Sequence, residues 1–313
     1  MPRRRRPPGE GRLLQLVYYA YVGGSALARA LPERVAYGIA HAAGGLQARL
    51  SKKKRAQVER NLARITGLPP GSPALDKVVL SAYRSYARYW LETFRLVREG
   101  PEFFLERFHL ANNELIDEVC ARGKGAVVVV GHLGNWDAAG AWVGARGNHL
   151  VSVAEVLRPR RLFEFFLEHQ GRLGMTIVPA ETGATDRLAE WVEKGAVVAI
   201  LGDRDLKGRG PLVRFFGEEV PFPAGSASVA FKAKVPLLMA SVYSTRLPNG
   251  KWGWTGEMRG PIELPDERSD EAIQTLTQQI ASTMEEFVAL HPEEWHVMQP
   301  FWPSDKERAG SSA

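Results

Sequence analysis

The fold is decided by residues 127–137, Val-Val-Val-Val-Gly-His-Leu-Gly-Asn-Trp-Asp. Four consecutive valines indicate a strand that is buried on both faces, as the strands of parallel sheets are. Gly131 ends this strand, and His132 follows at its carboxyl end, where open α/β sheets bind their ligands. Asn135 is a favourable N-cap for a helix over residues 136–146. The stretch therefore predicts a strand, a turn that carries a histidine, and a helix.

This histidine has a candidate partner in the same stretch. Residues five positions apart on one continuous helix point away from each other, so His132 and Asp137 can meet only if the turn folds back. Gly134 makes such a turn accessible. The carboxylate would then hold one imidazole nitrogen and leave the other as a general base, as in a serine-protease triad without the serine. The alternative is a strand-to-helix connection with an incidental histidine.

A histidine and an aspartate in this arrangement after an apolar strand resemble the first motif of the glycerolipid-type acyltransferases. The full string at residues 132–137 is similar to the branch that acylates bacterial glycolipids, which contains the lipid A and the phosphatidylinositol mannoside acyltransferases. Residues 153–159 resemble the second block of that family, and residues 201–205 with 215–217 resemble the third. The tail string at residues 295–300 also matches, so the resemblance covers most of the chain.

The resemblance implies roles for particular residues. His132 would be the general base, Asp137 would orient it, and Asp203 would take part in catalysis where the family usually has a longer glutamate. The family has an arginine in the helix after the Arg-Pro block, but Gln170 occupies that position and Arg172 lies two residues further on, on another helix face. The implied substrate-binding residues are Glu155, Arg158, Gln170, Arg172, Arg204 and Arg209, with no metal ligand.

Two sources for the phosphate-binding charge stay open. Arg172 could supply it through a local irregularity of the helix. The other candidates are the arginines at positions 158, 160 and 161, which precede the same helix.

The length allows one large α/β domain or two small ones. We expect a single domain over residues 1–313, with membrane-associating helices in residues 1–66. The formal charge is +6, which suggests an anionic partner such as a membrane, a phosphate-bearing substrate or nucleic acid. Cys120 is the sole cysteine, so an internal disulfide framework and a cysteine metal site are excluded. The sequence has no nucleophile elbow, no Walker A loop and no RNA-binding signature.

The N-terminal region allows three interpretations. Arg3 to Arg6 precede an uncharged stretch at residues 13–28, which could be a signal peptide, a short transmembrane span or an interfacial helix. We favour the interfacial helix, because the stretch contains glycines and its tyrosines suit headgroup depth. A helix that packs on the domain is compatible with partial membrane contact. The basic run at residues 52–55 would also bind anionic lipid.

The rest of the chain alternates between strand and helix patterns. Apolar strands near residues 149–155, 175–178 and 196–201 are separated by helical segments, which predicts an α/β fold: a mainly parallel central sheet flanked by helices on both faces. Residues 215–225 read as an irregular apolar connection that could line an acyl chain, and residues 235–243 and 252–258 as two strands. A helix at residues 75–99 carries arginines on one face, which either lie in water or form a basic surface at the membrane or at the mouth of the site.

The resemblance implies a membrane-associated acyltransferase at the cytoplasmic face of the plasma membrane. It would move a palmitoyl chain from acyl-CoA to the 6-hydroxyl of a mannose in phosphatidylinositol mannoside, as a monomer, without a cofactor and without nucleic acid. Anionic membrane lipid would be a further partner. The alternatives are transfer to a lipid A precursor or a lysophospholipid, and a non-catalytic protein that binds anionic membranes or nucleic acid. The basic helices alone would allow that last alternative, and residues 132–137 argue against it.

Overall fold

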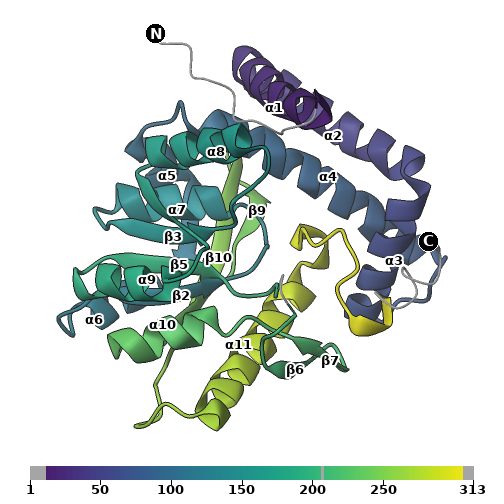
Figure 1. Ribbon diagram of the computed structural model, residues 1–313. Coiled ribbons are helices and arrows are strands. Elements are labelled where there is room, and N and C mark those ends of the chain that lie inside the picture. The colour runs from purple at the N-terminus through teal and green to yellow at the C-terminus, as the bar shows by residue number, and fades with distance from the viewer. Residues whose placement is uncertain (1–11, 206–207, 306–313) are drawn as a thin grey trace.

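The computed structural model describes residues 12–205 and 208–305, which form a mixed α/β fold (Figure 1). The central sheet has the strand order β1-β10-β8-β2-β5-β3-β4, and β9 also pairs with β10. The strands are β1 (Phe108–Ala111), β2 (Ala126–Val130), β3 (Leu150–Ala154), β4 (Met175–Pro179), β5 (Val197–Leu201), β8 (Leu237–Ala240), β9 (Tyr243–Arg246) and β10 (Trp252–Ile262).

The valine strand β2 lies in the middle of the parallel part of the sheet. It pairs in parallel with β5 on one side and with β8 on the other, and β3 and β4 continue the parallel arrangement. β10 is antiparallel to β8, so β10 and β1 extend the sheet in the opposite direction. Val127, Val128 and Val129 are all buried. The predicted mainly parallel sheet and the two-sided burial of the valine strand are confirmed.

Helices cover both faces of the sheet. Val127 and Val129 share one core with side chains of α9, α10 and α11, whereas Val128 shares the other with side chains of α6 and α7. Successive strand residues point to opposite faces, which is why one strand serves two cores. The helices of the sheet region are α5 (Pro101–Arg107), α6 (Glu114–Cys120), α7 (Trp136–Ala145), α8 (Arg160–Arg172), α9 (Ala184–Glu193), α10 (Gly225–Ala233) and α11 (Asp270–Leu290).

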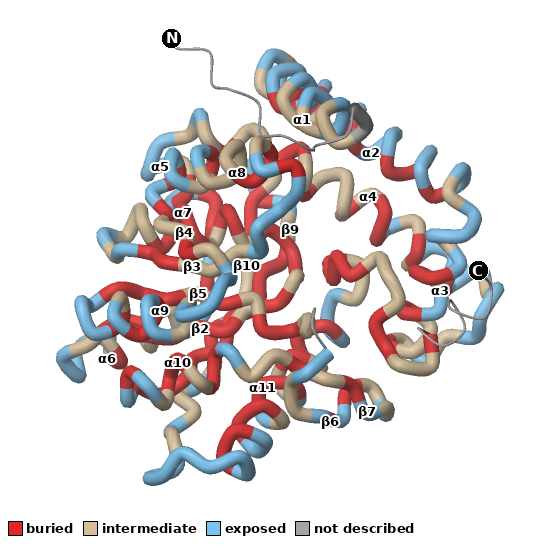
Figure 2. Tube along the Cα trace, viewed as in Figure 1, coloured by how far each residue is buried: buried red, intermediate tan, exposed pale blue. Residues whose placement is uncertain are grey.

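Four helices precede the sheet and lie beside it (Figure 1). They are α1 (Arg12–Ala30), α2 (Glu33–Leu50), α3 (Lys52–Thr66) and α4 (Pro73–Leu96). The hydroxyl of Ser72 caps α4 by accepting a hydrogen bond from the amide of Leu75 (3.2 Å). Figure 2 shows that α1 and α2 are exposed over much of their length, while the sheet is buried.

The connection after β5 differs from the prediction. Residues 212–221 form a hairpin of β6 (Leu212–Phe215) and β7 (Glu218–Pro221) rather than an irregular loop. Its turn residues Phe216 and Gly217 have φ angles of 47° and 80°. Hairpin turns of this kind favour asparagine and glycine, so a phenylalanine gives no hairpin signal in the sequence.

Three smaller features also differ. The single strand predicted over residues 235–243 is divided into β8 and β9, which pair with different parts of β10. The long helix ends at Leu96 and is followed by α5 and β1, which the sequence pattern did not predict. A short 3-10 helix, η1 (Pro292–Glu294), follows α11.

Within residues 12–205 and 208–305, no helix combines the length and the apolar character that crossing a membrane requires.

Gly44 sets how closely α2 approaches α4. A Cβ atom at Gly44 would lie 2.6 Å from the carbonyl oxygen of Tyr83 and 2.8 Å from the Cα atom of Arg84. At the neighbouring Gly45, the nearest atom would be a side-chain nitrogen of Arg84 at 3.6 Å, an ordinary contact. The two adjacent glycines are therefore a matched pair for testing this helix contact.

We expect Gly44→Ala to lower the free energy of unfolding by about 1–3 kcal/mol, because backbone atoms of α4 cannot yield as a side chain can. Gly45→Ala should leave it unchanged or raise it by up to about 1 kcal/mol, because alanine favours helix. Urea denaturation of the two variants measures the difference. Equal stabilities would contradict the close packing of α2 on α4.

Candidate active site

The turn after β2 presents His132 at the carboxyl edge of the sheet. Asn135 caps α7, since its Oδ1 atom accepts a hydrogen bond from the amide of Ala138 (3.1 Å), as predicted. Gly134 has a φ of +59°, and a Cβ atom there would lie 2.3 Å from the carbonyl oxygen of Val242. Glycine is therefore required at this position both for the backbone conformation and for the close approach.

Asp203 holds the imidazole of His132. The Nδ1 atom of His132 lies 2.6 Å from Oδ1 of Asp203, and the backbone amide of His132 donates to Oδ2 over 2.9 Å. Asp203 follows β5, the strand beside β2, so the carboxyl ends of two adjacent parallel strands bring the pair together. The side chain of Asp203 is fully buried, whereas that of His132 stays 20% exposed. A substrate can therefore reach the imidazole but not the carboxylate.

The segment after α11 completes this arrangement. The indole Nε1 of Trp295 donates to Oδ2 of Asp203 (2.9 Å), and the amide of His296 donates to the carbonyl of His132 (2.7 Å). The carbonyl of Glu294 accepts from the amide of Gly134 (3.0 Å). The tail therefore fixes both the catalytic turn and the buried carboxylate.

Asp137 has other partners. Its carboxylate accepts hydrogen bonds from Nε2 of Gln170 (3.1 Å) and from the hydroxyl of Thr93 (3.3 Å). In the described part of the chain it makes no hydrogen bond with His132. The prediction that Asp137 orients His132 is wrong, because α7 begins at Trp136 and turns Asp137 toward α4 and α8. Asp203 does this instead.

The pKa values of the two buried aspartates shift in opposite directions. At Asp203, burial alone would raise the pKa, but the nearby His132 and the hydrogen bonds from His132 and Trp295 outweigh it and lower the pKa. At Asp137, burial raises the pKa, and the hydrogen bonds from Gln170 and Thr93 and the proximity of His169 only partly oppose it. Asp203 is therefore an ionised acceptor at neutral pH. When the imidazole of His132 is neutral, this hydrogen bond places its proton on Nδ1 and leaves Nε2 as an acceptor.

Aromatic side chains line the turn. The rings of His132 and Trp136 meet edge to face, with centroids 5.3 Å apart, and Tyr89 packs on Trp136 at 4.4 Å. His296 is buried beside them, and its Nε2 pairs with the hydroxyl of Ser85 (2.9 Å). Burial, followed by the charges of Arg88 and His132, lowers the pKa of His296 to about 3. His296 is therefore a neutral wall of the site.

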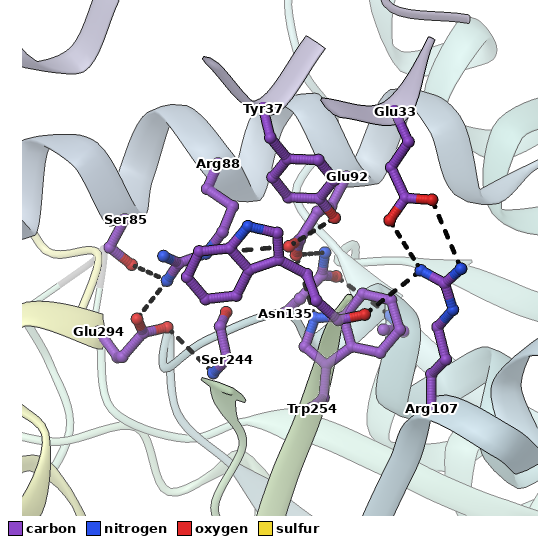
Figure 3. Close-up of polar contacts among 12 residues, drawn as sticks. Glu33, Tyr37, Ser85, Arg88, Glu92, Arg107, Asn135, Ser244, Trp254 and Glu294 are labelled. Carbon is purple, nitrogen blue, oxygen red and sulfur yellow. Dashed lines mark hydrogen bonds and ion pairs between the residues drawn. The ribbon is translucent and has the colours of Figure 1, made fainter. Parts of the chain in front are cut away.

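A buried polar network supports the turn from α4 (Figure 3). Glu92 accepts hydrogen bonds from Nδ2 of Asn135 (3.0 Å), from the indole of Trp254 (3.0 Å) and from the hydroxyl of Tyr37 (3.1 Å). Arg88 pairs with Glu294 and lies 3.8 Å from Glu92. The network links the N-cap of α7 to the segment after α11.

The arginine side chains of α4 are therefore not all exposed to solvent. Arg88 is mostly buried in this network, and Arg95 donates to the carbonyls of Ala28 and Leu31 at the end of α1. The prediction that these arginines are solvated is wrong for both residues. Burial is tolerated because each guanidinium has acceptors.

The other predicted site residues differ in whether they lie at the same edge of the sheet as His132. Gln170 joins Asp137, as described above. Glu155 and Arg158 are exposed on the loop after β3, and Arg204 and Arg209 lie on the loop after β5. These two loops leave the same edge of the sheet as His132. They therefore stay candidates for substrate contact.

Arg172 does not join this group. Its guanidinium pairs with Glu168 on the solvent-facing side of α8 (2.7 Å). Gln170, two residues earlier, faces Asp137 on another side of the helix. No local irregularity of α8 brings Arg172 to the turn that carries His132, because the helix runs unbroken from Arg160 to Arg172.

An apolar cavity lies between the sheet and α7, with about 700 Å³ of empty space including its opening to solvent. It begins near the catalytic turn, at Val130, Trp136 and Leu201, and passes under Trp142 and Val143. Further lining comes from every strand of the main path of the sheet, at Leu110, Val128, Leu150, Ile177, Ala199, Ala240 and Met258. Its lining is almost entirely apolar, as the walls of pockets for apolar ligands are.

The connection at residues 215–225 does not line this cavity. Phe215 and Phe222 are fully buried and pack with Trp295, Phe301 and Trp302 in the core on the other face of the sheet. These two side chains are packed in the core and do not face an open cavity. Its role is to hold the tail that carries Trp295.

Sequence reasoning missed the supporting residues. Trp295 and His296 belong to a matching tail string, but no spacing in the sequence connects them to Asp203 or His132. Glu92 gives a weak signal, since it is a charged residue among the aromatic positions of α4. Among the described residues, no group of three or more His, Cys, Asp or Glu side chains is arranged to hold a metal ion.

Comparison with known proteins identifies the class. Residues 7–304 match the family model of the bacterial lipid A biosynthesis acyltransferases. The chain is 32% identical over 294 residues to the phosphatidylinositol mannoside acyltransferase of Mycolicibacterium smegmatis, covering 93% of both chains. It is 30% identical over 296 residues to the protein of the same name from Mycobacterium tuberculosis (strain CDC 1551 / Oshkosh), covering 92% of this chain and 89% of the relative. The chain is an acyltransferase. It belongs to the bacterial lipid A biosynthesis acyltransferase family.

The opposite pKa shifts of Asp203 and Asp137 predict opposite effects of the same substitution. Asp203→Asn should lower the free energy of unfolding at pH 7 by about 2–3 kcal/mol, because it removes a charged acceptor of three hydrogen bonds. Asp137→Asn should change it by less than about 1 kcal/mol or raise it, because it removes a charge that burial disfavours.

The pH dependence follows from the signs of the shifts. Ionised Asp203 stabilises the fold above the unfolded-state pKa of about 3.9, and this stabilisation is lost as the pH falls through the lowered folded pKa. Burying the carboxylate of Asp137 destabilises the folded state, and this destabilisation grows as the pH rises from about 3.9 through the raised folded pKa. The difference in free energy of unfolding between the two variants should therefore become smaller as the pH is lowered. Chemical denaturation at several pH values measures it, and a gap that widens toward low pH would refute these ionisation states.

Proposed function

We propose that the protein transfers a long acyl chain, palmitoyl, from acyl-CoA to the 6-hydroxyl of a mannose in phosphatidylinositol mannoside. The observation that carries this proposal is the dyad of His132 and Asp203 beside an apolar cavity. The relatives in two mycobacteria are named for transfer to phosphatidylinositol mannoside, which supports the acceptor class.

The dyad suits attack by an alcohol on a thioester. Nε2 of His132 takes the proton of the mannose hydroxyl as its oxygen attacks the acyl carbon, and Asp203 stabilises the imidazolium that forms. The carbon–sulfur bond then breaks, coenzyme A leaves as a thiolate, and the imidazolium returns a proton. An ester and free coenzyme A result. No cofactor is required, because the thioester is already activated.

The cavity supplies a place for the acyl chain. Its near end is formed by Trp136, whose ring contacts that of His132, so a chain in the cavity would hold its thioester beside the imidazole. An apolar lining favours a hydrocarbon chain over water. Candidates for the phosphate groups of the substrates are Arg158, Arg204 and Arg209, on the loops that leave the same sheet edge.

The exposed side chains of α1 and α2 support a peripheral position on a membrane, which we propose to be the cytoplasmic face of the plasma membrane. Among the described residues, eight of the thirteen exposed large apolar side chains lie on α1 and α2, where a membrane-facing helix would carry them. They are Leu16, Val17, Tyr19, Leu27, Val35, Ile39, Leu46 and Leu50. The basic run Arg3 to Arg6, which would add to this attraction, lies outside the described residues.

We expect His132→Ala to lower the rate of transfer of labelled palmitate to phosphatidylinositol mannoside by about 10²–10⁴-fold, because it removes the general base. His109→Ala is a matched control at an exposed strand position, and it should keep wild-type activity. The assay compares both with wild type at saturating substrate. A folded His132→Ala protein with full activity would exclude this mechanism.

A larger side chain on β5 should shorten the apolar cavity. Ala199 lines its middle, and Ala199→Phe should lower kcat/KM for palmitoyl-CoA by about tenfold or more while affecting a short-chain acyl-CoA less. Ala121→Phe, at an exposed position, is the control. Equal losses for long and short donors in a folded Ala199→Phe protein would show that the acyl chain binds elsewhere.

A further inference from the structure

A second large hollow lies between α2, α4 and the β9–β10 hairpin. This basic groove has about 1550 Å³ of empty space, counted up to open solvent. Five of its lining side chains are cations, Arg34, Arg84, Arg88, Arg246 and Lys251, whereas its single acidic side chain is Glu33. Cationic groups therefore dominate its walls.

Most of these cations are not neutralised. Glu33 forms an ion pair with Arg107, which lies outside the groove (3.0 Å). Arg88 forms an ion pair with Glu294. Within residues 12–205 and 208–305, the structure pairs none of Arg34, Arg84 and Lys251 with a carboxylate. Arg246 likewise lacks a carboxylate there, and its guanidinium lies over the ring of Trp252 (4.0 Å) and bonds the carbonyl of Gly250. Like charges so close are unfavourable unless an anion joins them.

Arg84 is the inner cation of the groove. Its Nε atom is buried and has no hydrogen-bond partner among the described residues. Burial and the charges of Arg84 and Arg88 lower the pKa of His41, which agrees with a positive potential in the groove. Guanidinium groups are planar forks that match the oxygens of phosphate.

The groove is separate from the active site. His132 and Asp203 do not line it, and it opens on a different face of α4 from Tyr89, which packs on Trp136. The residues of α2 that line it, Arg34 and His41 among them, adjoin the exposed apolar side chains Val35 and Ile39 on the same helix. A basic hollow beside an apolar ridge suits the surface of an anionic bilayer.

We propose that the basic groove is a phosphate-binding site distinct from the catalytic site. The headgroup of an anionic lipid and a soluble phosphate share the chemistry that Arg34, Arg84, Arg246 and Lys251 recognise. The lipid arm of the test uses vesicles of phosphatidylcholine alone and of equimolar phosphatidylcholine and phosphatidylinositol. The soluble arm titrates inorganic phosphate by calorimetry. Both use the full-length protein.

The first variant is R34Q/K251Q, which removes two exposed charges at the rim without disturbing a packed contact. It should weaken by about tenfold the binding of the ligand that the groove takes, which is phosphatidylinositol in vesicles or inorganic phosphate. R268Q/K234Q is the matched control, because it removes two exposed charges outside the groove and leaves the same net charge. The control should bind as wild type does.

R84Q tests the inner cation, with circular dichroism to verify its fold, and it should weaken binding in the same arm. A loss confined to phosphatidylinositol vesicles identifies a lipid headgroup, and a loss for inorganic phosphate identifies a soluble phosphate as a ligand; either supports the site. Equal binding by the groove variants and the control, or no binding by wild type in both arms, would overturn it.

Discussion

The ionised carboxylate of Asp203 is the group on which the rest of the site depends. It is fully buried, and a buried charge is costly unless donors surround it. Its three hydrogen bonds come from the backbone and ring of His132 and from the indole of Trp295. Two adjacent parallel strands and the segment after α11 must therefore meet at one point. The charge that holds the imidazole of His132 therefore also requires these segments to pack together.

Rigidity of the imidazole follows from the same contacts. The turn is bound through its backbone by Glu294 and His296, and through Asn135 by Glu92. Catalytic groups act best when their surroundings hold them in place before the substrate arrives. The network of Arg88, Glu92 and Glu294 thus supports the turn that carries His132, although none of these side chains forms a hydrogen bond with His132 in the described structure.

The sequence predicted most of the sheet, because the valine run and the alternation of strands and helices are local patterns. It also singled out His132, Asp137 and Asp203 as site residues. It paired His132 with Asp137, five residues away, while the structure pairs it with Asp203, 71 residues away on the neighbouring strand. Partners such as Trp295 depend on where the tail packs, 92 residues from Asp203, and no local pattern encodes that. Local rules failed where a contact between distant segments decided the outcome.

Helix α4 shows how one sequence segment can serve two surfaces. Its aromatic face, with Tyr89, packs on the catalytic turn, and its arginine face, with Arg84, lines the basic groove beside α2. Arg88 belongs to both, since it lines the groove and pairs with Glu294 below the turn. An anion in the groove would compete with Glu294 for this guanidinium only if Arg88 left its buried ion pair, which is costly. The exposed cations around Arg88 can therefore take a phosphate while the support of the active site stays intact.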